Sequence, residues 1–195
     1  MPPKEERPVL MEVCILAGGL SSRMGRDKTR LRLGGKTLLS HVKSAAAALE
    51  CPVRVIRRDI VSRCGPLGGV YTALRTTEAS RILFLSCDVP FVPASLLERM
   101  ASALRRKSRA VFVRHDQLLG FPFLLTAESL DDVEGALRER RLALQELAKR
   151  LKASVIRPTR REAASLLNVN TPGDWIQARR IWKRLCNGLE APRSG

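Results

Sequence analysis

The first stretch whose residue types suggest chemistry is LAGGLSSRMGRDK, residues 16–28, which follows an apolar run. Gly18 and Gly19 let the backbone come close to a ligand, so that its amide groups can point at phosphate oxygens. Arg23 can donate to two oxygens at once, and Lys28 adds a compact positive charge. The pattern predicts a loop that wraps the phosphates of a nucleotide. The alternative is a strand–turn–helix connection with two incidental basic residues.

Two acidic residues follow apolar runs further along the chain. Asp88, in FLSCDVPF, comes directly after a wholly apolar segment, and a lone carboxylate there suits Mg²⁺, whose remaining ligands are waters and substrate phosphates. The alternative is that Asp88 caps the turn before Pro90. Asp59 follows a short predicted strand, VRVIRR (53–58), and precedes the glycine-rich stretch CGPLGG, residues 64–69, which opens a predicted helix.

A fourth stretch, NVNTPGDW (168–175), places two asparagines before a predicted helix. Asn168 and Asn170 could hydrogen-bond a ligand or a metal-bound water. Asparagine also commonly caps a helix, and Thr171 could do the same. By contrast LGGKT, residues 33–37, is not a phosphate-binding P-loop, because that motif needs a glycine where Arg30 stands.

The elements needed to hold these stretches alternate between strands and helices. Apolar runs predict strands at 9–17, 53–58, 81–87, 110–115, 121–126 and 154–158. Composition and helical spacing predict helices at 37–50, 94–106 and 171–185, a helix growing out of the turn in 65–80, and one long or two short helices in 129–151. This order predicts an α/β fold with a mostly parallel sheet and helices on both faces, in which ligands gather at the carboxyl ends of the strands. We expect one domain over 9–186, between flexible tails at 1–8 and 187–195.

Composition restricts the kind of protein and its partners. The chain has 195 residues, 45% of them hydrophobic, and a formal net charge of +16, which favours anionic partners such as nucleotides or phosphorylated small molecules. The five cysteines show no zinc-site spacing and are odd in number, which suits a reducing cytoplasm. The start of the chain carries acidic residues and lacks a signal peptide's apolar core, and no segment approaches the ~20 apolar residues of a membrane span. We therefore expect a cytoplasmic protein without a membrane partner.

Taken in this order, LAGGLSSRMGRDK, GGKTLLSHV, CGPLGG, CDVPF and NVNTPGDW resemble the molybdenum cofactor guanylyltransferase family of the nucleotidyltransferase superfamily. The resemblance runs from Leu16 to Trp175. It implies a Rossmann-like nucleotidyltransferase fold. It also implies a Mg²⁺-dependent reaction that transfers GMP from GTP to the phosphate of molybdopterin and releases pyrophosphate. Molybdoenzymes or their chaperones are further partners that such a product implies.

The resemblance also assigns roles to residues of this chain. Leu16, Ala17 and Gly18 would meet the guanosine, Lys28 the phosphates, and Asp88 both Mg²⁺ and GTP. The implied catalytic residues are Arg23, Lys28 and Asp88. The implied nucleotide-binding residues are Leu16, Ala17, Gly18, Gly19, Lys28, Asp59, Gly65 and Asp88, with Asn168 and Asn170 on the acceptor side or supporting it.

The chain departs from the family in one place. The family has a further strand, ending in an asparagine that contacts the base, before the equivalent of Asp59, whereas no asparagine lies between Lys28 and Asp59 here. A sister nucleotidyltransferase that uses CTP or another phosphorylated acceptor is therefore an alternative. A basic, non-catalytic protein that binds nucleotides or nucleic acid is a second one. The aromatic content of 4% argues against the latter, since it leaves few platforms on which bases could stack.

Overall fold

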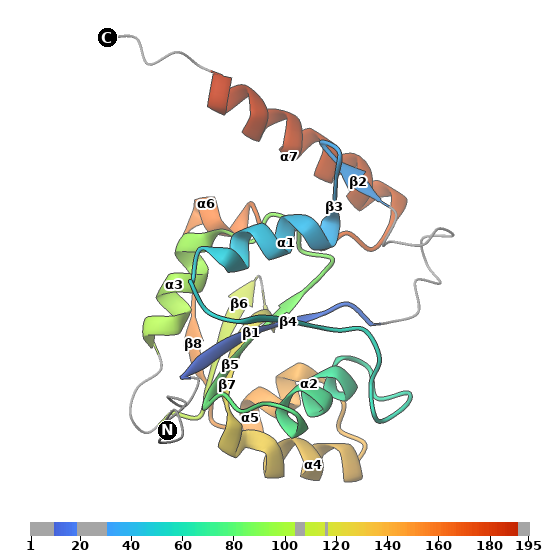
Figure 1. Ribbon diagram of the computed structural model, residues 1–195, viewed down its shortest axis with the longest axis vertical. Coiled ribbons are helices and arrows are strands. Elements are labelled where there is room, and N and C mark those ends of the chain that lie inside the picture. Colours follow the sequence, from blue (N-terminus) through green and yellow to red (C-terminus); the bar gives the residue numbers. More distant parts are fainter. Residues whose placement is uncertain (1–9, 19–30, 104–107, 116, 191–195) are drawn as a thin grey trace, which may run out of the picture.

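The computed structural model describes residues 10–18, 31–103, 108–115 and 117–190, and for 187–190 the backbone alone. Its centre is a six-stranded sheet in the order β4-β1-β5-β7-β6-β8 (Figure 1). The strands are β1 (Met11–Leu16), β4 (Val53–Ile56), β5 (Arg81–Ser86), β6 (Ala110–His115), β7 (Leu118–Thr126) and β8 (Ser154–Ile156). Only β7 runs antiparallel to its neighbours, so the predicted mostly parallel sheet is confirmed.

Helices cover both faces of this sheet, as predicted (Figure 1). One face carries α2 (Pro66–Arg75), α4 (Leu130–Arg138) and α5 (Leu144–Arg150), and the other carries α1 (Leu38–Ala47) and α3 (Ala94–Ala103). The alternation of β1 explains the two layers, because Cys14 and Leu16 belong to the first apolar cluster while Val13 and Ile15 belong to the second. The strands are apolar on both faces because each face packs against helices.

Several elements differ in extent from the sequence-based expectation. The segment 129–151 forms two helices, and the turn between them includes Arg140 in the left-handed region at φ 56°. Strand β7 begins at Leu118 rather than 121, because it pairs with β6 as far as His115. A short hairpin of β2 (Arg32–Leu33) and β3 (Lys36–Thr37) and the one-turn helix α6 (Arg160–Ala163) were not predicted.

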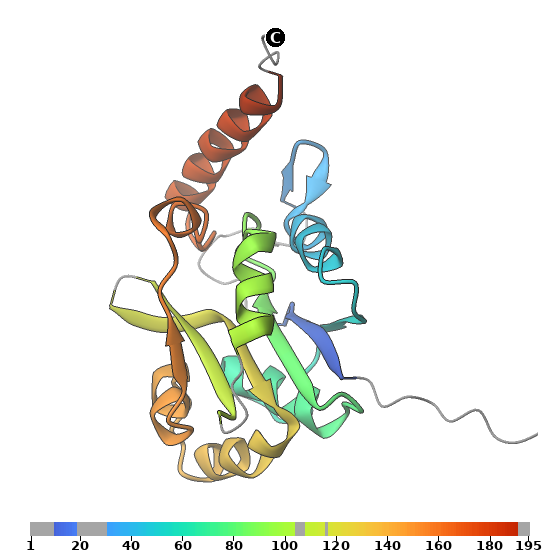
Figure 2. The same ribbon diagram turned by 90° about the vertical axis from the view of Figure 1, so that its left-hand side faces the viewer.

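The last helix, α7 (Pro172–Glu190), continues five residues past the predicted end and into the segment expected to be a tail. It lies outside the two helical layers, against the β2–β3 hairpin (Figures 1 and 2). A third, small apolar cluster joins them, in which Leu33 and Ala178 are buried and Trp182 is partly buried. Within the described residues, no helix combines the length and the apolar character needed to span a bilayer.

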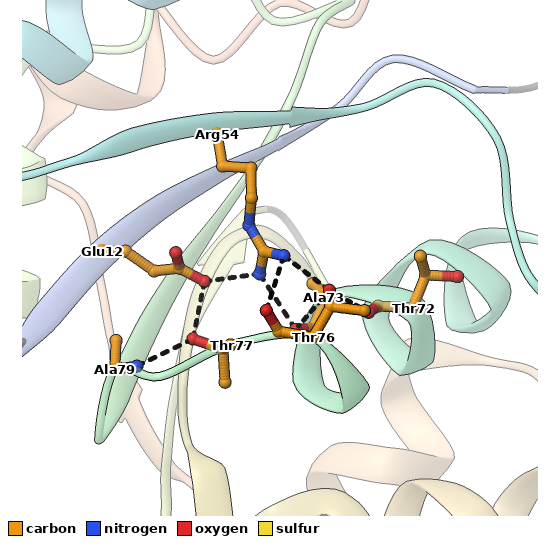
Figure 3. Close-up of polar contacts among 7 residues, drawn as sticks. All are labelled: Glu12, Arg54, Thr72, Ala73, Thr76, Thr77 and Ala79. Carbon is orange, nitrogen blue, oxygen red and sulfur yellow. Dashed lines mark hydrogen bonds and ion pairs between the residues drawn. The ribbon is translucent and has the colours of Figure 1, made fainter.

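A buried ion pair connects the amino-terminal ends of β1 and β4 with the end of α2 (Figure 3). Arg54 Nη2 donates to Glu12 Oε1 at 2.6 Å and to the carbonyl oxygen of Ala73 at 2.9 Å. Arg54 Nη1 donates to the carbonyl oxygen of Thr76 at 3.2 Å, and Thr77 Oγ1 donates to Glu12 Oε1 at 2.8 Å. The guanidinium therefore caps the carboxyl end of α2 and fixes that helix against the sheet.

Candidate functional site

A pocket of about 450 Å³ lies at the carboxyl-terminal edge of the sheet. Its walls come from the ends of β1 and β5, from the loop after β4 and the start of α2, and from β7. Because β1, β4 and β5 run parallel, the segments that follow them meet at one edge. The residues that line the pocket are Leu16, Gly18, Asp59, Arg63, Cys64, Gly65, Pro66, Gly69, Ser86, Asp88 and Phe121.

Five of the predicted site residues line this pocket: Leu16, Gly18, Asp59, Gly65 and Asp88. Ala17 is adjacent, and its backbone nitrogen donates to the carbonyl oxygen of Ile56 at 2.8 Å, which extends the β1–β4 pairing to the pocket's edge. Gly19, Arg23 and Lys28 lie outside the described residues. The structure therefore brings the two predicted carboxylates onto one cavity, and the predicted cations remain predictions.

Asp59 is held against three glycines. A Cβ at position 68 would lie 2.7 Å from Asp59 Oδ2, and one at position 69 would lie 3.4 Å from Asp59 Oδ1. A Cβ at position 18 would lie 3.7 Å from the same Oδ1 and 3.2 Å from the carbonyl oxygen of Arg57. Gly18, Gly68 and Gly69 thus make room for the Asp59 carboxylate within the protein itself. The sequence did not indicate this role of the glycines.

The environment of Asp59 is polar on the pocket side and otherwise packed. Ile60 N donates to Thr72 Oγ1 at 3.0 Å, and Thr72 Oγ1 donates to the carbonyl oxygen of Gly68 at 2.8 Å, so the loop is fixed to the first turns of α2. Partial burial raises the pKa of the Asp59 carboxyl above its ordinary value. Within the described part of the chain, the carboxylate has no hydrogen-bond or ion-pair partner, so its oxygens are available to a ligand.

The start of α2 faces the same pocket. Gly65, its N-cap, has φ 55° and ψ −146°, a conformation that favours glycine, and Pro66 occupies the first turn. Both line the pocket. The amino end of a helix carries partial positive charge and unpaired amide groups, which favours an anion close to it.

Asp88 is held by Ser86, which is close to it in sequence, and by residues 168–169, which lie far along the chain. Ser86 Oγ donates to Asp88 Oδ1. With its amide nitrogen turned toward the carboxylate, Asn168 donates to Asp88 Oδ1 at 2.8 Å and to Oδ2 at 3.2 Å. The backbone joins in as well, because Val169 N donates to the carbonyl oxygen of Asp88 at 2.8 Å. Asp88 is thus fixed in orientation by side chains and backbone together.

The two predicted asparagines have different surroundings. Asn168 contacts Asp88, whereas the backbone nitrogen of Asn170 donates to Asp174 Oδ2 at 3.0 Å. Thr171 caps α7, since Asp174 N donates to Thr171 Oγ1 at 3.2 Å and Thr171 N donates to Asp174 Oδ2 at 2.8 Å. Asn170 does not line the pocket.

Sequence reasoning did not select Arg63, Cys64, Ser86 or Phe121 among the pocket residues. Arg63 is the only cation that lines the pocket among the residues the structure describes, and its place within RRDIVSRCGPLGG, four residues after Asp59, was the available signal. Phe121 lies in β7 and belongs to the fringe of the first apolar cluster. No local pattern distinguishes it from a core aromatic residue.

Two carboxylates on one pocket, beside a helix start and glycine-rich loops at the edge of a mostly parallel sheet, fit a nucleotidyltransferase. Comparisons with known protein families, sequences and structures agree with this assignment. The family model described as "MobA-like NTP transferase domain" matches residues 13–155, which is most of the chain. The protein is a nucleotidyltransferase and belongs to the MobA-like NTP transferase family.

Curated relatives carry names from molybdenum cofactor synthesis. A protein from Rhizobium leguminosarum bv. trifolii named "Molybdenum cofactor guanylyltransferase" is 32% identical over 192 residues, covering 85% of this chain and 90% of its own. One of the same name from Shewanella baltica is 29% identical over 147 residues, covering 66% of this chain and 75% of its own. The resemblance noted in the sequence is confirmed, and the relatives support a guanylyl transfer role in molybdenum cofactor biosynthesis.

Solved structures share the fold. Molybdopterin-guanine dinucleotide biosynthesis protein A from Archaeoglobus fulgidus superposes with a TM-score of 0.67 at 22% identity, over 89% of this chain and all of its own. A 4-diphosphocytidyl-2C-methyl-D-erythritol synthase from Anaerococcus prevotii superposes with a TM-score of 0.68 at 14% identity, over 91% of this chain and all of its own. The predicted Rossmann-like nucleotidyltransferase fold is confirmed.

Proposed function

We propose that this protein transfers GMP from GTP to the phosphate of molybdenum-bound molybdopterin, forming the guanine dinucleotide cofactor and releasing pyrophosphate. The observation that carries the proposal is the pocket on which Asp59, Gly65 and Asp88 converge, with Asp88 held by Ser86 and Asn168. Asp59, which has no partner in the described part of the chain, and Asp88, which is firmly held, lie on the same cavity. These two acids fit the two ends of a nucleotide.

Asp59 is suited to the nucleoside end. Its carboxylate is partly buried, has no partner in the described part of the chain and offers two acceptor oxygens. Guanine presents two neighbouring donors, N1–H and the N2 amino group, which match a carboxylate in a bidentate manner. Cytosine offers one amino donor on the corresponding edge. In a chain that lacks the family's asparagine before this position, Asp59 is therefore our choice for the group that favours guanine.

Asp88 is suited to the phosphate end and fits a Mg²⁺ ion. The described residues contain no cluster of three or more potential ligands from His, Cys, Asp and Glu, so a metal held here would depend on one carboxylate and on substrate oxygens. Ser86 and Asn168 each donate to Asp88 and fix the orientation of its carboxylate toward a metal. When bound, Mg²⁺ would neutralise charge on the transferring phosphoryl group.

The remaining side chains act by positioning and by charge. The acceptor phosphate is itself a nucleophile near neutral pH, so its in-line attack on the α-phosphorus of GTP requires no general base. The obstacle is repulsion between two polyanions. The positive charges of Arg23 and Lys28, in the stretch 16–28, and of Arg63, on the pocket wall, would offset this repulsion. Asn168 keeps the Asp88 carboxylate in place, and Phe121 adds an apolar side chain to the pocket wall.

The test is a pyrophosphate-release assay with molybdopterin, Mg²⁺ and each of GTP, CTP, ATP and UTP. We expect turnover with GTP alone, and a thermal shift panel should show the largest stabilisation with GTP. Preferential turnover of CTP would identify the sister activity instead. Absence of turnover with every nucleotide, together with salt-sensitive binding to DNA, would favour the basic binding protein.

A further inference from the structure

Helix α7 and the β2–β3 hairpin enclose a second groove of about 470 Å³, separate from the nucleotide pocket. The helix has 19 residues and so a length of about 28 Å. Its outer part extends beyond the rest of the molecule in both views (Figures 1 and 2). The groove therefore lies on a projecting surface that a second molecule can reach.

Among the residues that the structure describes, four cations line this groove and no acid does. Arg32 comes from the hairpin, and Arg179, Arg180 and Lys183 come from α7. All four are exposed, and within the described residues none has a carboxylate within 4 Å. Elsewhere on the surface, Arg109, Lys149 and Arg150 pair with acids, whereas other exposed cations such as Lys43 and Arg161 pair with no described acid. The groove thus concentrates positive charge that the protein does not neutralise itself.

Apolar side chains lie between these charges. Ile176 lines the groove and is 55% exposed, and Leu185, further along α7, is 46% exposed. Trp182 forms part of the wall, but its ring lies against Gly34 and makes an edge contact with His41, at 4.8 Å between ring centres. An occupant that satisfies this surface has to supply negative charge and an apolar stripe together.

We propose that the groove between α7 and the β2–β3 hairpin is a docking site for an acidic, amphipathic segment of a partner protein. Carboxylates of the partner would pair with Arg32, Arg179, Arg180 and Lys183, and its apolar side chains would cover Ile176. Charge complementarity is what selects this occupant, and it would steer association at low ionic strength.

Two other occupants fit the groove less well. A second copy of this chain carries the same net charge of +16, so two copies repel each other at long range. Nucleic acid would match the charge but not the apolar residues between the cations. The ring of Trp182 is also partly occupied by its contacts with Gly34 and His41, which disfavours base stacking on it.

The test uses fluorescence anisotropy with a labelled helical peptide of about 18 residues, with leucines on one face and glutamates on the other. A scrambled peptide of the same composition separates the apolar stripe from charge alone. We expect the full-length protein to bind the amphipathic peptide at least about tenfold more tightly than the scrambled one, and less tightly as ionic strength rises.

Two protein variants with the same charge change localise the binding. R179E/K183E alters the groove, whereas R138E/R140E alters exposed residues at the end of α4, on the other side of the sheet. We expect R179E/K183E to weaken peptide binding about tenfold or more, R138E/R140E to weaken it less than about threefold, and both to keep GMP transfer. Equal loss in the two variants, binding by R179E/K183E at the wild-type level, or loss of GMP transfer in R179E/K183E alone would overturn the proposal.

Two controls complete the experiment. Circular dichroism establishes that R179E/K183E is folded, and I176D, which keeps all four cations, provides an independent variant that should also weaken binding. An equal affinity for the scrambled peptide, or displacement of the amphipathic peptide by a DNA duplex at lower concentration than by unlabelled peptide, would likewise overturn the proposal.

Discussion

The two ends of the parallel strands β1, β4 and β5 carry acidic residues in different situations. At the amino-terminal end, Glu12 accepts hydrogen bonds from Arg54 and Thr77, and Arg54 in turn caps α2 (Figure 3). At the carboxyl-terminal end, Asp59 is surrounded by glycines and has no partner among the described residues, while Asp88 is held by two neutral donors. The first acid is neutralised within the fold, whereas Asp59 has no counter-charge among the described residues.

This difference separates stability from function along the same strands. A partly buried acid that is paired holds elements together, and removing its charge leaves an unpaired cation. An acid that is partly desolvated and has no partner among the described residues, as Asp59 is, makes folding somewhat less favourable when it is ionised. The protein retains such an acid at the pocket, which is expected where a ligand supplies the missing partner.

The largest effect should come from Asp88→Asn at the functional end. The substitution keeps the shape of the side chain but removes the charge, so we expect a loss of about a thousandfold in pyrophosphate release at unchanged thermal stability. Asp131→Asn, at an exposed position of α4, is the matched control and should be fully active. Substantial activity of Asp88→Asn with Mg²⁺ would remove Asp88 from its proposed role.

At the structural end, Glu12→Gln should lower stability and spare the chemistry. The Glu12 and Arg54 side chains are 10% and 29% exposed, so the loss of the carboxylate leaves a largely buried guanidinium without its counter-charge. We expect a decrease of about 2 kcal/mol in the free energy of unfolding, measured by urea denaturation. Glu128→Gln, an exposed acid, should change it by less than about 0.5 kcal/mol. A Glu12→Gln protein as stable as the wild type would show that the ion pair contributes nothing.

Asp59→Asn should have the opposite effect to Glu12→Gln, because it should weaken GTP binding and leave stability unchanged or higher. We expect the affinity for GTP to fall about tenfold, because a carboxamide turns one acceptor into a donor toward guanine, while stability at neutral pH is maintained or increased. Since burial raises the pKa of Asp59 in the folded state, the native protein binds this proton more tightly than the unfolded chain does. This group's contribution to stability therefore falls as pH rises from its ordinary pKa through the raised one.

The pH dependence gives a second readout for the same residue. Urea titrations of wild type and Asp59→Asn across the acidic range should show this decrease in the wild type and not in the variant. If the two proteins depend on pH in parallel, the charge of Asp59 is compensated in the folded state and the proposed contrast with Glu12 is wrong.

The smallest expected effects come from alanine substitutions at two glycines with different surroundings. Gly68→Ala places a Cβ 2.7 Å from Asp59 Oδ2 and should displace the carboxylate, raising KM for GTP and destabilising the fold by about 1 kcal/mol. Gly173→Ala, at the start of α7, meets only Thr171 Oγ1 at 3.6 Å and should be neutral or stabilise by up to about 1 kcal/mol. Equal behaviour of the two alanine variants would mean that Asp59 moves aside without consequence.

Much of the fold and part of the pocket could be predicted from sequence. Buried parallel strands appear as continuous apolar runs, and the acids and glycines that end them must lie at one edge, which is how Gly18, Asp59, Gly65 and Asp88 were found. The family resemblance assigned their roles, and those roles remain proposals. Asn168 was selected by its position before a helix, but its contact with Asp88 depends on how the last segment packs.

Other features could not be predicted because they depend on tertiary contacts. Phe121 has the same local pattern as the core aromatic Phe123, and only the sheet order brings it to the pocket. The hairpin of β2 and β3 consists of two-residue strands, too short for a periodic signal, and is supported by the packing of Gly34 against Trp182. Helix α7 continues to 190 through Asn187 and Gly188, residues that commonly end a helix, so the expected end at 185 was too early.

The backbone bond from Val169 to Asp88 joins segments eighty residues apart, late in the chain. A growing polypeptide that has not yet reached this point already contains β1, β4, β5 and Ser86, but it lacks the hydrogen bonds that Asn168 and Val169 donate to Asp88. The protein can therefore acquire a fully ordered pocket only once its synthesis is almost finished. Shortened forms that end before Asn168 should keep the cavity and lose the order of its Asp88.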